Sequence, residues 1–211
     1  MDARTFQQRL MQRLAGSQPN HAPEHSRFGA RLNHGADERL LAMMPRDARA
    51  AAVLIGFQEY AGEPAILLTV RAGHLRKHAG QIAFPGGRLD PGEATLQAAL
   101  REAHEEIGLP PDRVRPLGRL SEAVVLQSAF RLTPWVASVP YPYPYAAAPG
   151  EVEAILHVPL PALLAPGVHR TERRLAYGIA VDVHYYETED GTIWGATARV
   201  LHELLGIWRT L

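Results

Sequence analysis

The spacing of apolar residues predicts a helix and then a β-hairpin in the first third of the chain. Residues 50–57 form an unbroken apolar run, and residues 65–70 form a second one. Such short runs are typical of buried strands, and the polar segment at 58–64 is short enough to join them as a hairpin. Nearer the N-terminus, apolar residues instead recur at helical spacing, and they are Phe6, Leu10, Met11 and Leu14.

A second helical segment, at 96–107, has two chemically different faces. Because each helical residue turns by about 100°, Glu102, Glu105 and Glu106 share one face. The other side is apolar, and it consists of Leu96, Leu100, Ala103 and Ile107. Pro110 and Pro111 end the helix. One side can therefore pack on a core while the other presents a dense group of carboxylates.

Strand patterns dominate the second half of the chain until a final amphipathic helix. The first predicted elements are a strand at 114–125 that is broken at Ser121–Glu122, a strand at 130–139 and an extended Tyr–Pro segment at 141–145. They are followed by a segment at 151–160 with a possible strand edge, a short helix at 159–164, strand material at 170–186 and a hairpin turn at Asp190–Gly191. The final helix begins at Gly195, and its apolar side consists of Ala198, Leu201, Leu204, Leu205 and Trp208.

Strands and helices interleave without a regular βαβ repeat, which predicts an α/β protein. The carboxylate-bearing helix and the terminal helix can cover opposite faces of one mixed sheet. At 211 residues the chain suits one domain with an extension. We expect a helical and irregular N-terminal extension at 1–45 and the main domain at 46–211.

Composition narrows the class of partner. The formal net charge is zero, so the whole molecule is not expected to bind nucleic acid, and any phosphate attraction must be local. The chain has no cysteine, which excludes disulfides and thiol catalysis. The first residues lack an apolar export segment, and the longest apolar run is too short to span a bilayer. We therefore expect a cytoplasmic protein without a membrane partner.

The carboxylate cluster favours a metal site. Two carboxylates about 4 Å apart repel by ~1 kcal/mol in water and by ~4 kcal/mol at an effective dielectric constant near 20. A solvated helix face tolerates this repulsion and is the simpler interpretation. Two neighbours favour a cation instead, namely Arg101 and the glycine turn Gly86–Gly87 before the helix. Hard oxygen ligands suit Mg²⁺ or Mn²⁺, and both ions also bind substrate phosphates.

A basic loop follows the predicted strand at 65–70 and suits a polyphosphate. Its basic residues are Arg71, His74, Arg76, Lys77 and His78, with Gly73 and Gly80 as hinges. Arginine and lysine can hold outer phosphates while a cation neutralises the bridging ones. A generic surface loop or a nucleic-acid patch are the alternatives. Glycines at 86 and 87 would let the backbone approach metal and substrate closely, or would simply form a tight turn.

Two sequence motifs carry a family resemblance. The spacing of Gly87, Glu93, Arg101–Glu102, Glu105–Glu106 and Gly108 resembles a complete Nudix box, in which Ala103 is small for its apolar position. The preceding segment resembles the additional signature of the coenzyme A pyrophosphatase branch of Nudix hydrolases, and it consists of Leu67–Leu68–Thr69, Arg71–Ala72, Arg76, Gly80 and Phe84–Pro85–Gly86–Gly87.

The resemblance implies a fold, a metal-dependent reaction and roles for particular residues. The fold would be an α/β/α sandwich with a mixed sheet, making 46–211 a Nudix hydrolase domain, and family analogy is compatible with a homodimer. The implied roles are metal ligation by Glu102, Glu105, Glu106 and Gly87, catalysis by the same three glutamates with Arg101, structural support by Gly86, Glu93 and Gly108, and substrate binding by Arg71, Arg76, Lys77 and Phe84. Arg101 would orient the carboxylates and pair with Glu93, although a plain helix partner of Glu105 is an alternative.

The branch signature implies that coenzyme A or a derivative is cleaved to 4′-phosphopantetheine and adenosine 3′,5′-bisphosphate. Glu151 or Glu153 would supply an additional ligand or base, or else lie at an ordinary strand edge. Tyrosines at 141–145 would stack on adenine or form a stiff connector, which we favour. Alternatives are hydrolysis of ADP-ribose, NADH or dinucleoside polyphosphates, and a non-catalytic nucleotide-binding module. The general base among the glutamates is left open.

Overall fold

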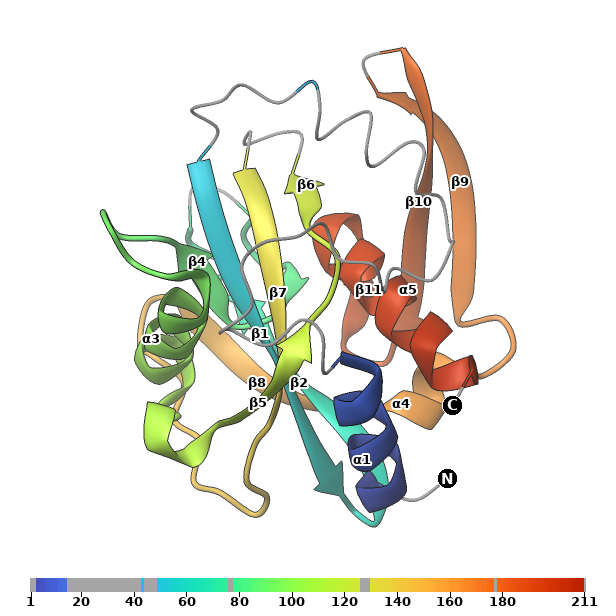
Figure 1. The fold of residues 1–211 in the computed structure, drawn as a ribbon. Helices are drawn as coiled ribbons and strands as arrows, with labels where there is room; N and C mark the ends of the chain where they lie inside the picture. The colour runs from blue at the N-terminus through green and yellow to red at the C-terminus, as the bar shows by residue number, and fades with distance from the viewer. Residues whose placement is uncertain are drawn as a thin grey trace.

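The computed structural model describes residues 3–14, 43, 49–75, 78–125, 130–176 and 178–210. A central sheet separates helices on its two faces (Figure 1). The helices are α1 (Ala3–Leu14), α3 (Thr95–Ile107), the 3₁₀ helix η2 (Pro111–Arg113), α4 (Leu160–Leu163) and α5 (Gly195–Thr210). The strands are β1 (Arg49–Tyr60), β2 (Glu63–Arg71), β3 (Ile82–Ala83), β4 (Gly86–Arg88), β5 (Arg115–Arg119), β6 (Ala123–Val125), β7 (Phe130–Ser138), β8 (Val152–Pro159), β9 (His169–Ala176), β10 (Ile179–Thr188) and β11 (Gly191–Ile193).

The central sheet is mixed, as the sequence predicts. Strands β1 and β2 form the expected antiparallel hairpin, with Phe57 opposite Ile66. Strand β7 instead runs parallel to β1, from Arg49 opposite Phe130 to Phe57 opposite Ser138. The sheet has the order β3-β2-β1-β7-β5, and β4, β6 and β8 pair with β1, β7 and β2. The break predicted at 121–122 is confirmed, since β5 ends before it and β6 begins after it.

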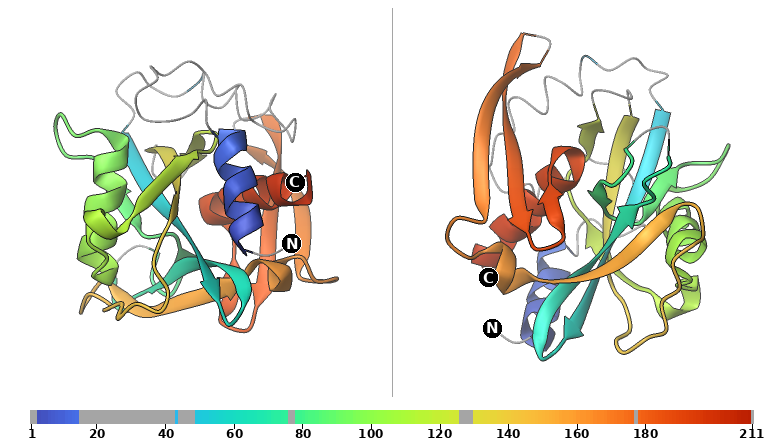
Figure 2. Two further views of the ribbon diagram at one scale, coloured as in Figure 1. Left: turned by 60° about the horizontal axis from the view of Figure 1, so that its bottom comes forward. Right: turned by 180° about the vertical axis from the view of Figure 1, so that it is seen from behind.

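The alternation of β1 residues builds a core on each face of the sheet. Ala52 and Leu54 pack with α3 in one cluster, whereas Val53 and Ile55 pack with α1 and α5 in the other. Figure 2 shows α3 on one side of the sheet and both terminal helices on the opposite side. The predicted covering of opposite faces by the carboxylate-bearing helix and the terminal helix is therefore confirmed, and the carboxylate face of α3 is left outside the core.

Helix α1 belongs to the core rather than lying apart from it. Leu10 and Leu14 are 0% and 1% exposed, and they join the same cluster as the apolar side of α5. The helix predicted from Phe6 to Leu14 is therefore present. Most of the remaining extension to residue 45 lies outside the described residues, so the predicted boundary at 45/46 stays a prediction.

The C-terminal strands form a second sheet that the sequence pattern does not separate from the first. Strands β9, β10 and β11 pair only with one another, in the order β11-β10-β9. This sheet lies against α5 through β10 (Figure 1). The turn between β10 and β11 comes one residue earlier than predicted, because Gly191 already pairs with Thr188. Two short strands also lie where a loop was predicted before α3. Strand β3 pairs with the end of β2, and β4 pairs with Ala51–Val53 of β1.

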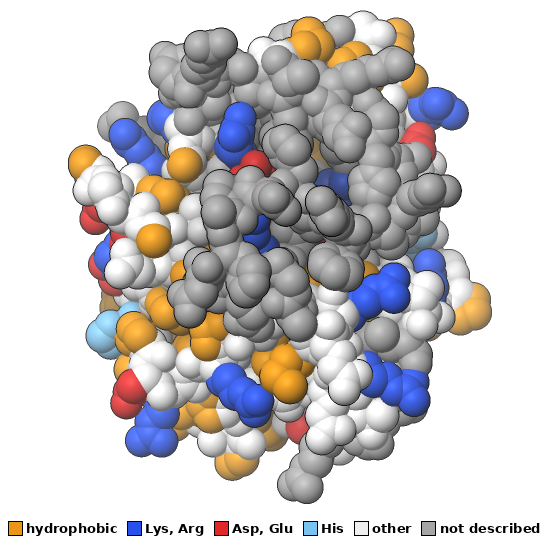
Figure 3. Space-filling view, viewed as in Figure 1, with side chains coloured by type: hydrophobic (Ala, Val, Ile, Leu, Met, Phe, Trp, Pro, Cys, Tyr) orange, Lys and Arg blue, Asp and Glu red, His pale blue; other side chains and the backbone are white. Residues whose placement is uncertain are grey.

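On the face shown in Figure 3, basic and acidic side chains of the described residues lie scattered among other types. Among the described residues, no helix is long and apolar enough to cross a membrane.

Candidate active site

Helix α3 presents its glutamates because small residues hold its other face against the sheet. Ala98, Ala99 and Ala103 are each 0% exposed in the cluster beneath the helix. The small side chain of Ala103 therefore suits a close approach of helix to sheet. The helix ends at Gly108, whose φ of 66° is the left-handed conformation that glycine adopts without strain.

Glu106 is the most deeply placed of the three glutamates. Its side chain is 4% exposed, against 17% for Glu102 and 57% for Glu105. The backbone N–H of Gly86 donates to Glu106 Oε2 at 3.0 Å, and Arg71 Nη1 lies 3.6 Å from Glu106 Oε1. Burial raises the pKa of Glu106 to about 7, although the Gly86 hydrogen bond and Arg71 both oppose this shift.

Gly87 and Glu102 fit together without room for a side chain at position 87. A Cβ on Gly87 would lie 2.4 Å from Glu102 Cδ. At Gly86, φ is 153° and a Cβ would meet the backbone oxygen of Ala52 at 2.3 Å. Both glycines of the turn are thus required by close approach to Glu102 and to strand β1. The expected approach of this backbone to metal and substrate stays a prediction. Burial also raises the pKa of Glu102, against the lowering effect of Arg101.

Arg101 connects the loop before α3 with the carboxylates on the helix. Its Nε and Nη2 each donate to one oxygen of Glu93 at 2.9 Å. Its Nη1 donates to Glu102 Oε1 at 2.9 Å and to Glu105 Oε2 at 3.2 Å, and Nη2 also donates to the Arg88 carbonyl at 3.0 Å. The hydrogen bonds from Arg101 lower the pKa of Glu93. The predicted Glu93 contact and the alternative Glu105 contact both exist in the structure.

The two late glutamates occupy different places. Burial is the main cause of the raised pKa of Glu102 and of Glu106, and the charge of Glu151 adds to it in the same direction. Glu153 lies farther along β8, and its Oε2 is 3.8 Å from where a Cβ on Gly73 would be. Of the two candidates, Glu151 is the one that interacts with the carboxylates of α3. Its role as ligand or base stays a prediction.

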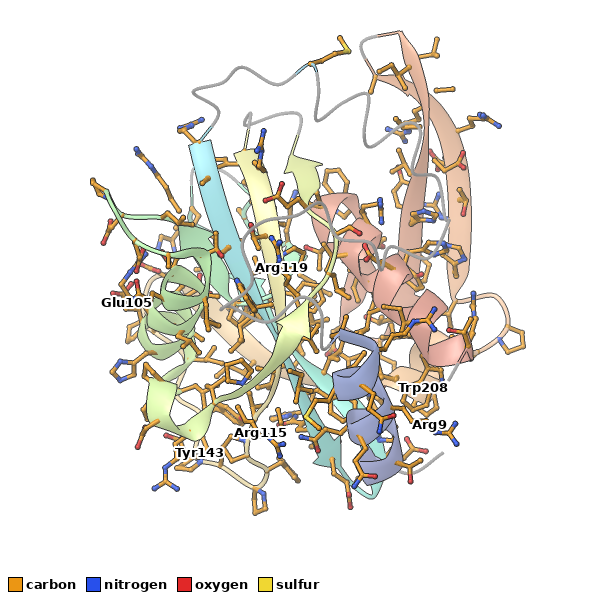
Figure 4. All side chains as sticks on the ribbon, viewed as in Figure 1. Arg9, Glu105, Arg115, Arg119, Tyr143 and Trp208 are labelled. Carbon is orange, nitrogen blue, oxygen red and sulfur yellow. The ribbon has the colours of Figure 1, made fainter. Side chains whose placement is uncertain are left out.

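These carboxylates have the chemistry that a divalent cation requires. Glu102, Glu106 and Glu151 bring like charges together, and burial has removed part of the water that would screen two of them. A cation would relieve that repulsion, and hard carboxylate oxygens suit Mg²⁺ or Mn²⁺. Glu105, labelled in Figure 4, lies at the exposed side of α3. The residues present therefore fit such an ion.

The predicted substrate-binding residues are placed unevenly. Arg71 ends β2, and its Nε is buried without a hydrogen-bond partner among the described residues. The next backbone N–H, of Ala72, donates to the Glu151 carbonyl at 2.9 Å and brings the two segments together. Phe84 is 4% exposed and packs in the core, so its contact with substrate stays a prediction. Arg76 and Lys77 lie outside the described residues.

The Tyr–Pro segment supports the end of α3, which the sequence alone did not reveal. The Tyr143 hydroxyl donates to the Gly108 carbonyl at 3.2 Å, and the Tyr145 hydroxyl donates to the Pro140 carbonyl at 2.7 Å. These contacts support the favoured interpretation as a stiff connector for two of the tyrosines. Tyr141 is 43% exposed. The only sequence indication of this support was the alternation of tyrosine with proline.

Comparison with known proteins agrees with the geometry. The NUDIX domain matches residues 45–175. Relatives in Cronobacter sakazakii and Salmonella paratyphi B, both named "Uncharacterized Nudix hydrolase NudL", are 41% identical over 149 and 163 residues. These alignments cover 67% and 74% of this chain, and 74% and 81% of the relatives. A MutT/nudix family protein from Enterococcus faecalis has a similar structure, with a TM-score of 0.55 and 16% identity over 86% of this chain and 70% of that one.

A mixed sheet between helices, with a carboxylate-bearing helix after a glycine turn, defines a Nudix-type pyrophosphatase fold and site. The chain belongs to the Nudix family. It is a Nudix hydrolase, a class that generally uses divalent cations such as Mg²⁺ or Mn²⁺.

Proposed function

We propose that this Nudix hydrolase cleaves the pyrophosphate bond of coenzyme A or its derivatives, giving 4′-phosphopantetheine and adenosine 3′,5′-bisphosphate. The observation that carries the proposal is the position of Arg71. This residue belongs to the motif that resembles the coenzyme A branch signature, and its guanidinium lies beside Glu106 with a buried Nε that has no partner among the described residues. A phosphate oxygen of the substrate would satisfy that donor.

The carboxylates and Arg101 would carry the hydrolysis. Glu102 and Glu106, with Glu105 close by, would hold the cation, which when bound neutralises phosphate charge and makes a bound water more acidic. Arg101 holds Glu102 and Glu105 from one side through charged hydrogen bonds. A carboxylate within hydrogen-bond reach accepts the proton of the attacking water. Glu106, whose pKa burial raises to about 7, is one candidate for this acceptor and Glu151 is another.

The basic loop would distinguish coenzyme A from other nucleotides. Arg71, Arg76 and Lys77 would hold the 3′-phosphate, which ADP-ribose and NADH lack. The test is to measure kcat/KM for coenzyme A and for dephospho-coenzyme A in the wild type and in Arg76→Ala. We expect Arg76→Ala to lose at least about tenfold with coenzyme A, consistent with loss of a charged hydrogen bond, and much less with dephospho-coenzyme A. Equal losses with both substrates would contradict the assigned role of the loop.

A further inference from the structure

Three histidines from separate elements meet at the junction between the small sheet and α5. His169 lies on β9, His184 on β10 and His202 on α5. One potential ligand atom of each lies within 4.8 Å of those of the other two. Among the described residues, this is the group of metal-ligating side chains that converges most completely, and it contains none of the glutamates of the active site.

The distances suit a shared ion. His169 Nε2 lies 3.1 Å from His184 Nδ1, whereas a tetrahedral ion with bonds of about 2.0–2.1 Å holds its nitrogen ligands roughly 3.3 Å apart. Two ring nitrogens at this distance must share either a proton or a cation. The ring of His202 stacks on His184 with 3.8 Å between centroids, and one of its nitrogens lies within 4.8 Å of the ligand atoms of the other two histidines.

The surroundings of the cluster supply the outer contacts of a metal site. The Tyr186 hydroxyl lies 3.0 Å from His202 Nδ1, which leaves Nε2 of that ring for an ion, and such a contact fixes the orientation of a ligating imidazole. The Thr171 hydroxyl lies 3.3 Å from His184 Nδ1 and 3.4 Å from His169 Nε2, the two nitrogens that would bind the ion.

Positive charge near the cluster is partly compensated. Arg199 and Arg209 both act on His202, and each would oppose a cation. Arg199, however, lies 3.8 Å from Glu203, one turn along α5, and that carboxylate is itself buried. The electrostatic repulsion of a bound cation would therefore come mainly from Arg209, which lies in the last turn of α5.

We propose that His169, His184 and His202 bind one transition-metal ion of the zinc class, which fastens the β9–β10 hairpin to α5. Three imidazole nitrogens favour Zn²⁺, Co²⁺, Ni²⁺ or Cu²⁺ over the Mg²⁺ or Mn²⁺ that suits the carboxylates. The Thr171 hydroxyl, which lies near two of these nitrogens, or a water would complete the coordination. The site belongs to the face of the central sheet opposite α3, so it is separate from the hydrolytic site.

The test uses the full-length chain with two active-site glutamates replaced, Glu102→Gln and Glu106→Gln, so that the two most buried carboxylates of α3 no longer compete for metal. Titration with Co²⁺ is followed by visible absorption, because a four-coordinate Co²⁺ absorbs far more strongly than a six-coordinate one. We expect one equivalent of strongly absorbing Co²⁺, displaced by one equivalent of Zn²⁺. His169→Asn in this background should abolish the absorption. His104→Asn, which removes an exposed histidine of α3, should leave it unchanged.

Two further measurements keep the test decisive if His169→Asn folds poorly. Tyr186→Phe removes only a hydroxyl, and it should weaken Zn²⁺ binding by about tenfold, within the range of roughly 10–100-fold for an outer contact. Zn²⁺ should also raise the thermal unfolding midpoint of the parent but not of His202→Asn. Absence of a strongly absorbing Co²⁺ species in the parent would overturn the proposal. So would its retention in folded His169→Asn, or equal Zn²⁺ affinity in Tyr186→Phe.

Discussion

Gly87 is the residue whose side chain, if it had one, would most directly disturb the site. A Cβ there would lie 2.4 Å from the Glu102 carboxylate. We predict that Gly87→Ala pushes this carboxylate aside and lowers kcat/KM by at least ~10-fold, since a displacement of about 1 Å can cost ~100-fold. Stability should change little because the displaced atoms end a flexible side chain. Steady-state kinetics and thermal unfolding of the variant separate the two effects.

Gly56→Ala is the matched control for that variant. Its Cβ would lie 3.2 Å from Val139 Cγ2, within the core beneath α3. Crowding there should lower the unfolding midpoint and leave the activity of the folded protein intact. Loss of activity in Gly56→Ala but not in Gly87→Ala would contradict the placement of Glu102 at the reaction site.

Glu106 is the residue at which charge and hydrolysis are most closely linked. We predict that Glu106→Gln lowers kcat by roughly 100-fold or more while the protein stays folded, because glutamine keeps the shape and removes the charge. Glu59→Gln, at the exposed end of β1, is the control. Unchanged activity in Glu106→Gln would contradict the role of Glu106 in hydrolysis.

The raised pKa of Glu106 also predicts how stability depends on pH in the metal-free protein. A carboxyl group whose folded pKa is about 7 and whose unfolded pKa is about 4.3 binds more protons when folded. Its contribution to stability is therefore full below pH ~4.3 and is lost as pH rises through ~7, by on the order of 3–4 kcal/mol. His202 has the opposite effect on stability. Its pKa is lowered in the folded protein, so the fold loses stability as the pH falls below the pKa of an ordinary histidine.

The difference in unfolding free energy between Glu106→Gln and the wild type isolates this effect, because both proteins contain His202. We expect the variant to be the more stable one at pH 8 without metal, and the advantage to shrink towards pH 5. Denaturant unfolding in the presence of a chelator measures it. An advantage that stays constant across this pH range would show that Glu106 is not strained by burial.

At the scale of elements, Arg101 joins helix α3 to the loop that precedes it. One guanidinium contacts Glu93 of the loop and Glu102 of the helix, each at 2.9 Å. We predict that Arg101→Lys lowers kcat by about 10–100-fold, because a lysine cannot make the forked contact that positions both carboxylates. In the Glu93→Gln background, Arg101→Lys should lower kcat by a smaller factor, since the ion pair between the two residues is already weakened. Steady-state kinetics of both single variants and the double variant tests this. Strictly additive losses would show that the two residues do not act together.

Helix α1 contributes to the core as an element, although it lies outside the region matched by the NUDIX domain. Leu10 is 0% exposed whereas Leu175 is 78% exposed. We predict that Leu10→Ala lowers the free energy of unfolding by about 2–5 kcal/mol and that Leu175→Ala changes it by less than about 0.5 kcal/mol. Denaturant unfolding compares the two directly. Equal effects would show that α1 does not pack as described.

At the scale of the whole molecule, local patterns predicted the elements better than their partners. Two patterns correspond to observed elements, namely the apolar run at 50–57 to β1 and the helical spacing from Gly195 to α5. The break at 121–122 corresponds to the gap between β5 and β6. The two faces of 96–107 predicted which side of α3 meets the core, because a 3.6-residue period is a local property. The motif spacing likewise placed the carboxylates, Arg101 and the glycine turn in one region before any contact was known.

Long-range pairing was less accessible to the sequence. Nothing local to β9 and β10 indicates that they leave the main sheet, because strand propensity does not specify a partner. The contact of Arg71 with Glu106 joins residues from a strand and a helix, and the convergence of His169, His184 and His202 depends on how the small sheet lies on α5. The spacing of residues along the chain carries no information about such tertiary contacts.

The most direct measurement is product analysis by mass spectrometry. Purified protein with Mg²⁺ or Mn²⁺ would be offered coenzyme A, ADP-ribose, NADH and a dinucleoside polyphosphate in parallel, with a chelator control expected to abolish turnover. We predict selective release of 4′-phosphopantetheine and adenosine 3′,5′-bisphosphate from coenzyme A. Preferred cleavage of another substrate would contradict the proposed specificity and leave the carboxylate chemistry standing. No cleavage of any of the four would also contradict that specificity, and it would favour a nucleotide-binding module or a substrate outside this set.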